Sequence, residues 1–456
     1  MTNPTAVLED VMELESPQEH SEPAILSGPS DARAADLPGW FRDQQRTAWA
    51  KFETLPYPNR KDQAWRFSSV NALDLSSYKQ GANLAQRERD EILERSTGLE
   101  AVAGRLIFAD DQLLRRDPLP EALLKCGMLL MPLERALIEH EELFRRHFMA
   151  QPATLGSAKF AALHEAFVKS GTFLYVPRGV EVELPIEIFH WLHAENSAVF
   201  PHMLLIADDL SKVTVIEHFR STHRDRGGFA CGVNDLVVGQ GAKVNYICAQ
   251  TWDDKVLSIQ INATTVARDA SGLSLNVHLG GAYSRFESLS RLSGEGARSD
   301  LLAVCVADGS QEFDARTLQD HTSPHTTSDL LYKNALTDQA RSTFGGLIRV
   351  EPHAHFTDAY QTVRNLLLSD DAEANSMPGL EIMADNVKCS HGATSGQVHE
   401  DELFYLLARG IPKNVAHRLL VSGFLNEAVE RLKQPVVAAK IHDLIEAKFD
   451  RAADQS

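Results

Sequence analysis

The chain has 456 residues, of which 43% are hydrophobic and 24% are charged, and its formal net charge is −18. This length allows two or three domains, and the hydrophobic content is ordinary for a globular protein with a packed core. The negative charge argues against nonspecific binding to nucleic acid or to an anionic membrane, because both require basic patches. No apolar run is long enough to predict a transmembrane helix, and residues 1–10 lack the basic start of a secretory signal.

The cysteines indicate a reducing compartment. An odd number of widely separated cysteines does not resemble a disulfide framework, so we expect a cytoplasmic protein. The five positions are Cys126, Cys231, Cys248, Cys305 and Cys389.

The N-terminal third divides into a tail and a helical region. Residues 1–35 are rich in Pro, Ser, Glu and Ala, which predicts a disordered tail. Residues 36–170 carry several helical patterns, such as Phe160, Leu163 and Phe167 on one face before Gly171. They predict a mostly helical N-terminal domain, with a mixed α/β stretch at 104–131.

A different pattern occupies residues 171–396. Apolar and polar residues alternate in short runs, for example at 172–176, 242–247 and 273–277. Turn-forming residues separate these runs, for example at 269–272. The pattern predicts a β core without helical crossovers.

Strand count alone leaves sandwich, barrel and solenoid open. Weak internal repeats favour a solenoid: Ala-Arg-Ser occurs at 297–299 and at 340–342, and Leu-x-Asp-x-Ala occurs at 336–340 and at 368–372. No fixed period extends along the whole stretch, however, so the pattern does not decide among the three folds.

Helical periodicity returns in residues 397–456, which predicts a C-terminal helical domain. Val437, Ile441 and Leu444 recur at steps of four and three residues. The end of a solenoid exposes unpaired strand edges. We therefore expect the terminal helices either to cover such an end or to leave it for a partner.

Cys389 and His391 form the most distinctive pair of potential ligands. Residues two apart in a strand point to the same face, and a thiolate beside an imidazole suits zinc or iron. Two ligands are too few for a closed site, so other residues or another chain would have to complete it. The alternative is a small core cysteine beside a polar histidine in a turn.

Other patterns have simpler interpretations. The His353-x-His355 pair is most simply a polar turn, and His321 and His325 flank Ser323-Pro324 in an expected loop. Asp370 and Asp371 would suit a β-helix carbohydrate-active enzyme, but adjacent acids in a turn are usually solvated. No phosphate-binding loop occurs. A further alternative is a homodimeric structural protein without a metal site.

Several segments together resemble the SufB/SufD family of the SUF iron–sulfur cluster assembly system, and SufD more than SufB. The likeness extends from about residue 36 to the end. It is carried by Arg-Lys-Asp-Gln-Ala-Trp-Arg-Phe at 60–67, Phe-Thr-Asp-Ala-Tyr-Gln at 356–361, Asn-Leu-Leu-Leu-Ser at 365–369, Leu-Glu-Ile at 380–382, Val-Lys-Cys-Ser-His-Gly-Ala-Thr at 387–394, Glu-Leu-Phe-Tyr-Leu at 402–406 and Arg-Gly-Ile at 409–411.

This resemblance implies a right-handed parallel β-helix core between N- and C-terminal helical domains. It also implies a non-enzymatic scaffold subunit that pairs with a SufB-like subunit through the β-helix and binds a SufC-like ATPase through the C-terminal helices. Such a complex builds a transient iron–sulfur cluster and transfers it to acceptors. ATP would act only through the ATPase partner. Homodimerisation in isolation and any role of a flavin stay open.

The same resemblance assigns roles to individual residues. His391 matches the histidine proposed to bind the nascent cluster at the SufB–SufD interface, and Cys389 is a secondary candidate. The functional SufB cysteine corresponds to Val363, and the SufB glutamate after the histidine corresponds to Gly392. These differences favour SufD, and they imply that this chain alone holds a cluster poorly.

Overall fold

The computed structural model describes residues 24–30, 35–81 and 83–453. Most of the predicted tail, residues 1–23 and 31–34, lies outside these ranges. Within the tail, Ile25–Ser27 form a 3-10 helix, η1, and Ile25 is fully buried. Its backbone N–H donates to the Tyr78 carbonyl oxygen at 3.0 Å. This part of the tail therefore packs against the domain.

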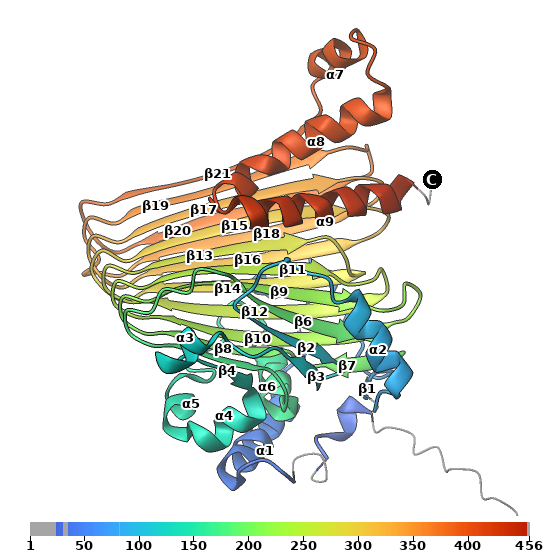
Figure 1. Cartoon of the computed structure of the whole chain (residues 1–456). Coiled ribbons are helices and arrows are strands. Elements are labelled where there is room, and N and C mark those ends of the chain that lie inside the picture. Colours follow the sequence, from blue (N-terminus) through green and yellow to red (C-terminus); the bar gives the residue numbers. More distant parts are fainter. Residues whose placement is uncertain (1–23, 31–34, 82, 454–456) are drawn as a thin grey trace, which may run out of the picture.

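The core is a β-solenoid built from two sheets, and from β8 to β21 strands that follow one another in the chain alternate between the sheets (Figure 1). The first sheet has the order β20 (Glu373–Ile382), β18 (Arg341–Val350), β16 (Glu312–His321), β14 (Tyr283–Leu292), β12 (Val256–Val266), β10 (Gly228–Val238), β8 (His202–Ala207), β5 (Thr172–Val176) and β4 (Leu129–Pro132), with β7 (Ser197–Val199) beside β10 and β1 (Lys79–Gln80) beside β7. The second has the order β21 (Lys388–Gln397), β19 (Asp358–Leu367), β17 (Thr327–Leu336), β15 (Arg298–Ala307), β13 (Ser271–His278), β11 (Lys243–Thr251), β9 (Lys212–Ser221), β6 (Ile186–Leu192), β2 (Gly104–Ala109) and β3 (Gln112–Arg116).

Each coil places its strands parallel to those of the preceding coil, and the repeat length varies. In the second sheet, Lys243, Ser271, Arg298, Thr327, Asp358 and Lys388 are stacked in register, so successive offsets are 28, 27, 29, 31 and 30 residues. Turn lengths absorb the variation while the strands stay aligned. This variation explains why the sequence shows repeats without a fixed period.

Alternate residues of each strand point into the solenoid. In β19, Gln361 and Val363 are buried, whereas Tyr360 and Arg364 are exposed. Inward residues of one coil lie on inward residues of the next, because the parallel register keeps the same face inside. The predicted alternation over residues 171–396 thus corresponds to the inner and outer faces of the coils.

The helices flank the solenoid. Those preceding or lying within its first coils are α1 (Gly39–Thr54), α2 (Gln86–Arg95), α3 (Glu121–Lys125), α4 (Leu133–Glu139), α5 (Glu141–His147) and α6 (Ala158–Phe167), with 3-10 segments η2 (Gln63–Trp65) and η3 (Val70–Ala72). Those that follow it are α7 (Glu400–Leu407), α8 (Lys413–Glu430) and α9 (Pro435–Ala453). Within the described ranges, no helix combines the length and apolar character needed to cross a membrane.

The predicted N-terminal domain is less separate than its helical pattern indicates. Residues 36–170 also supply β1 to β4, and β2 pairs in parallel with β6, aligning Leu106 with Ile188. The first coils therefore use strands from both sides of the expected boundary at residue 170. β2 and its antiparallel partner β3 lie in the stretch at 104–131 expected to be mixed α/β, but a parallel partner about 80 residues away gives little local signal.

A buried ionic cluster fastens the 60–67 segment to the solenoid. The Arg285 guanidinium contacts Asp314, donates through Nε to Glu287 Oε1 at 2.9 Å, and lies 3.7 Å from the centre of the Trp65 ring. Trp65 Nε1 donates to the Gly156 carbonyl oxygen at 3.0 Å. The 60–67 segment, which resembles an early motif of the SufB/SufD family, therefore packs against the solenoid of the same chain.

A second junction is a chain of buried polar groups between α6, β8 and β10. His164 Nδ1 donates to the Cys231 carbonyl oxygen at 2.7 Å, so His164 Nε2 is the acceptor that faces His202 Nδ1 at 3.2 Å. His202 Nε2 then carries the lone pair and lies 3.7 Å from Asp235 Oδ2, which accepts the Met149 N–H. Burial raises the pKa of Asp235 to about 7, which favours its protonated form beside that lone pair.

An Asp235→Asn variant should be stabilised relative to the wild type at high pH. The folded pKa of Asp235 lies above its ordinary value of 3.8, so folding favours the protonated carboxyl, and its contribution to stability is lost as the pH rises from about 4 to about 7. The loss is roughly 4 kcal/mol for a shift of about three pKa units. The asparagine side chain does not ionise, so the variant does not lose this stability as the pH rises. Its amide can also donate to His202 Nε2.

Urea unfolding of both proteins between pH 5 and pH 9 measures this effect. The stability difference should grow in favour of Asp235→Asn with rising pH. The exposed-residue variant Glu295→Gln serves as the control and should show a difference that does not change with pH. A pH-independent difference for Asp235→Asn would contradict the raised pKa.

Candidate functional site

The C-terminal end of the solenoid is uncovered. β20 pairs only with β18, and β21 pairs only with β19, so within the described residues both final strands have a free edge. α8 packs on β15 and β17, at the side of the stack, and not over the last coil. Side chains that earlier coils bury are partly exposed here, as shown by Leu380 and Ile382. Of the two expectations for the terminal helices, the structure matches the one that leaves an end open.

Cys389 and His391 both lie on β21 at this open end. The parallel register aligns Cys389 with Ala359 and His391 with Gln361, and both β19 residues are buried inside the coil. The two candidate ligands therefore share the inward face of the last coil, as their spacing predicts. Since no further coil lies above them, the inward face is also a molecular surface.

The environments of the two candidate ligands differ. Cys389 is half-buried and packs against a small apolar cluster that includes Ile348 and Val350, whereas His391 is exposed. Burial, together with the nearby Asp358 carboxylate, raises the pKa of the Cys389 thiol. A protonated thiol is a poor metal ligand. His391 is therefore the more accessible of the two candidates, and Cys389 packs partly in the core.

The ligand set is incomplete in this chain. Over the described ranges, no group of three or more His, Cys, Asp and Glu side chains is arranged to hold a metal ion. A stable four-coordinate site needs more donors than β21 supplies. The geometry suits a site that a second molecule completes at the open end.

A second distinctive surface is the tip formed by α7 and the start of α8, which projects away from the solenoid (Figure 1). None of the residues of α7 is buried. Large apolar side chains are exposed here, with Phe404 70% and Tyr405 56% accessible. The others on this tip are Leu407, Val415 and Leu419. An apolar surface of this kind on a projecting element marks an interaction site.

The opposite end of α8 is fixed to the outer face of the second sheet. Val421 and Leu425 pack in one apolar cluster with Leu331 of β17. Glu427 forms an ion pair with Lys333, whose ammonium group is almost fully buried. The projecting tip is thus rigidly connected to the coils near the open end.

Comparison with known proteins identifies the family. The family model described as "SUF system FeS cluster assembly, SufBD core domain" matches residues 190–424, and the "SufBD protein N-terminal region" matches residues 35–188. The chain belongs to the SufBD family. The SufBD core match covers more than half of the sequence and includes β21 and the tip.

Individual relatives span nearly the whole chain. The iron–sulfur cluster assembly protein SufD of Bacillus subtilis is 29% identical over 426 residues, which cover 90% of this chain and 94% of that protein. SufB of the same organism is 25% identical over 414 residues, covering 88% of each chain. A SufBD family protein of Staphylococcus haemolyticus is also 25% identical over 414 residues. The expected likeness to the SufB/SufD family is confirmed.

The positions at which the sequence differs from SufB are also visible in this SufBD structure. Val363, which stands where SufB is expected to have its functional cysteine, is fully buried in β19 and aligned with Ala393. Gly392 lies next to His391, and a side chain at this position would meet no atom within 4 Å. The space for an acidic residue is present, but the carboxylate is not.

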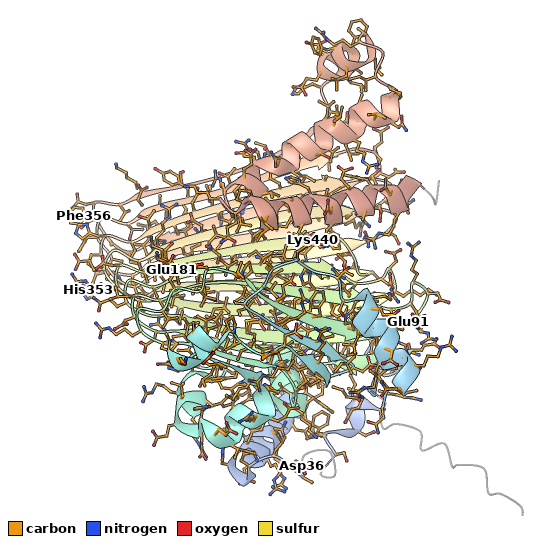
Figure 2. The ribbon with its side chains drawn as sticks, viewed as in Figure 1. Asp36, Glu91, Glu181, His353, Phe356 and Lys440 are labelled. Atoms are coloured by element: carbon orange, nitrogen blue, oxygen red, sulfur yellow. The ribbon has the colours of Figure 1, made fainter. Side chains whose placement is uncertain are left out.

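The other histidines named from the sequence lie away from this end face. His353 and Phe356 lie at one corner of the stack, where the coils turn (Figure 2). His355 Nδ1 is 3.1 Å from the Asp385 carbonyl oxygen, so this histidine joins two turns. The loop expected around Ser323-Pro324 lies between β16 and β17, and His321 precedes it as the last residue of β16. His321 is buried and contacts Thr326 and Ser328.

The residue that sequence reasoning did not connect with the site is Gln361. In the sequence it is the last residue of the segment 356–361, yet the register pairs it with His391 on the neighbouring strand. The two residues are 30 positions apart, which is one coil. A known coil length would have revealed the pairing, but the variable offsets hide it.

Proposed function

We propose that this chain is a SufD-like scaffold subunit of a SUF complex, and that it pairs through the open end of its solenoid with a SufB-like subunit. The observation that supports this proposal is the position of His391 on the inward face of an uncovered last coil. Free edges of β20 and β21 offer backbone groups for strand pairing with another chain. The partner would contribute the ligands that this chain lacks.

The nascent iron–sulfur cluster is the cargo of this site. His391 supplies an imidazole nitrogen, a ligand suited to iron, while the half-buried Cys389 contributes less. An incomplete ligand set on each subunit suits a scaffold, because the cluster has to be released after assembly. The complex would work in the cytoplasm, with acceptor proteins receiving the cluster.

A SufC-like ATPase would bind the projecting tip of α7 and α8. The tip offers exposed aromatic side chains, which commonly anchor protein interfaces. Because the other end of α8 is packed on β15 and β17, movement of the ATPase would act on the coils beside the open end. ATP hydrolysis on the partner could thereby open or close the cluster site.

A His391→Ala variant should lose cluster assembly while keeping its partners. The substitution removes an exposed side chain, so folding and complex formation should be unchanged. Cluster formation is followed anaerobically by visible absorbance after co-expression with the SufB-like and SufC-like proteins of the same organism. A loss of at least about 10-fold is expected, the scale typical of a lost metal-site interaction.

The matched control is His353→Ala, which removes an exposed histidine at the turn corner. It should assemble clusters like the wild type, and Cys389→Ser should have a smaller effect than His391→Ala. Normal cluster formation by His391→Ala in an intact complex would refute the role of His391. If the wild-type chain does not co-purify with either the SufB-like or the SufC-like protein, the proposed complex is refuted.

A further inference from the structure

Gln361 has a buried amide oxygen without a partner. The side chain is 1% exposed, and Oε1 makes no hydrogen bond. The amide nitrogen is 3.4 Å from Gln319 Oε1, while the Gln319 amide donates to Ser328 and to the Tyr360 carbonyl oxygen. The nitrogen of Gln361 is therefore the atom that faces Gln319, and its oxygen is left for another donor. Buried carbonyl oxygens are rarely left unpaired.

The surroundings hold this amide in one place. On the facing strand β18, a side-chain carbon at Gly346 would lie 2.2 Å from Gln361 Nε2. The lack of a side chain at Gly346 therefore makes the room that the Gln361 amide occupies. Gln361 therefore spans the interior of its coil, and its amide nitrogen lies against Gly346 on the opposite sheet.

His391 is the residue stacked above Gln361. The two are paired in the parallel register of β19 and β21, and neighbouring strands are about 4.8 Å apart. The imidazole is exposed. A neutral imidazole has one N–H donor and one lone pair. Histidines that bind metals usually donate this N–H to a carbonyl or carboxylate oxygen.

We propose that Gln361 is a positioning residue for His391. Its Oε1 accepts the N–H of the His391 ring, which fixes the tautomer and directs the other nitrogen, with its lone pair, out of the open end. The proposal rests on the proposed role of His391 as a cluster ligand. In this arrangement the buried Gln361 orients the exposed His391 before the partner binds.

The direct test is the tautomer of His391 in the full chain, read from 15N chemical shifts of 15N-histidine-labelled protein. The signals of His391 are identified as those missing from the spectrum of His391→Ala. In the wild type one tautomer should dominate, and in Gln361→Met, which has a similar size and no carbonyl oxygen, both tautomers should be populated. Gln361→Glu restores an acceptor and should restore the single tautomer.

The matched control is Asn365→Met. Asn365 is a buried amide on the same strand, but it is aligned with Ser395, so its loss disturbs the core without touching His391. The tautomer of His391 should not change in this variant. In the complex, Gln361→Met should slow cluster assembly about 10- to 100-fold, and Asn365→Met should slow it far less.

An unchanged tautomer in Gln361→Met would overturn the proposal, as would equal losses of cluster assembly in Gln361→Met and Asn365→Met. The outcome that challenges the proposed function is different. If the tautomer responds to Gln361 as expected but His391→Ala still assembles clusters normally, the contact between the two residues is established and the role of His391 in the scaffold fails.

Discussion

An Arg285→Met variant is expected to lose about 3–5 kcal/mol of unfolding free energy, because the substitution leaves the buried Glu287 carboxylate without its cation and leaves Asp314 with Arg316 alone. Arg285 is fully buried, and so are the carboxylates of Glu287 and Asp314 that it contacts. Its guanidinium also lies over the Trp65 ring, so the 60–67 segment loses a contact as well. Methionine keeps much of the volume but cannot neutralise either carboxylate.

Chemical denaturation of the two proteins at pH 7 measures this loss. Arg298→Met is the matched control, since Arg298 forms an ion pair with Asp300 but its side chain is half-exposed. Exposed pairs contribute at most about 1 kcal/mol, so the control should unfold close to the wild type. A loss below about 1 kcal/mol for Arg285→Met would show that the cluster does not hold the N-terminal segment in place.

A Phe404→Glu variant is expected to abolish binding of the SufC-like ATPase. Phe404 is the most exposed of the large apolar residues on the projecting tip. If it is buried in the interface, removing an aromatic anchor and burying a charge should cost several kcal/mol, which corresponds to a loss of affinity of at least about 100-fold. The fold should be unaffected, because α7 buries no side chain.

Calorimetric titration of the purified chain with the ATPase measures this loss, and circular dichroism checks the fold. Val436→Glu provides the control, because Val436 is an equally apolar and 67% exposed residue at the start of α9, at the far end of α8 from the tip. It should bind the ATPase like the wild type. Wild-type affinity in Phe404→Glu would place the ATPase elsewhere on the molecule.

Local sequence patterns predicted the elements of this fold better than their arrangement. Alternation and turn residues predicted short strands in residues 171–396, although β2 and β4 of the first coils precede this range. The i, i+2 spacing placed Cys389 and His391 on one face. These are properties of a single strand. The pairing of His391 with Gln361 depends on coil length, which varies from 27 to 31 residues. The stretch expected to be mixed α/β at 104–131 contains β2, but its pairing with β6 was not predicted, because β6 lies far along the chain.

Exposure at the candidate site is a property of the whole stack. The sequence around His391 is that of an inward-facing strand, and in an earlier coil such a side chain would be buried. It is exposed here because nothing follows β21 in its sheet. His321 shows the opposite case: it flanks the loop at Ser323-Pro324, yet it is buried, and β18 of the next coil pairs with it through Val350.

The uncovered coil also has a thermodynamic consequence. In a linear array of stacked units, each unit is stabilised by its neighbours on both sides, and a terminal unit has one neighbour only. The coil that carries His391 is therefore the one whose local opening costs the least free energy. A docked subunit would act as the missing neighbour and convert a fraying terminus into an interior unit. Association would then lower the entropy of the ligand-bearing strand at the moment when its ligands are needed.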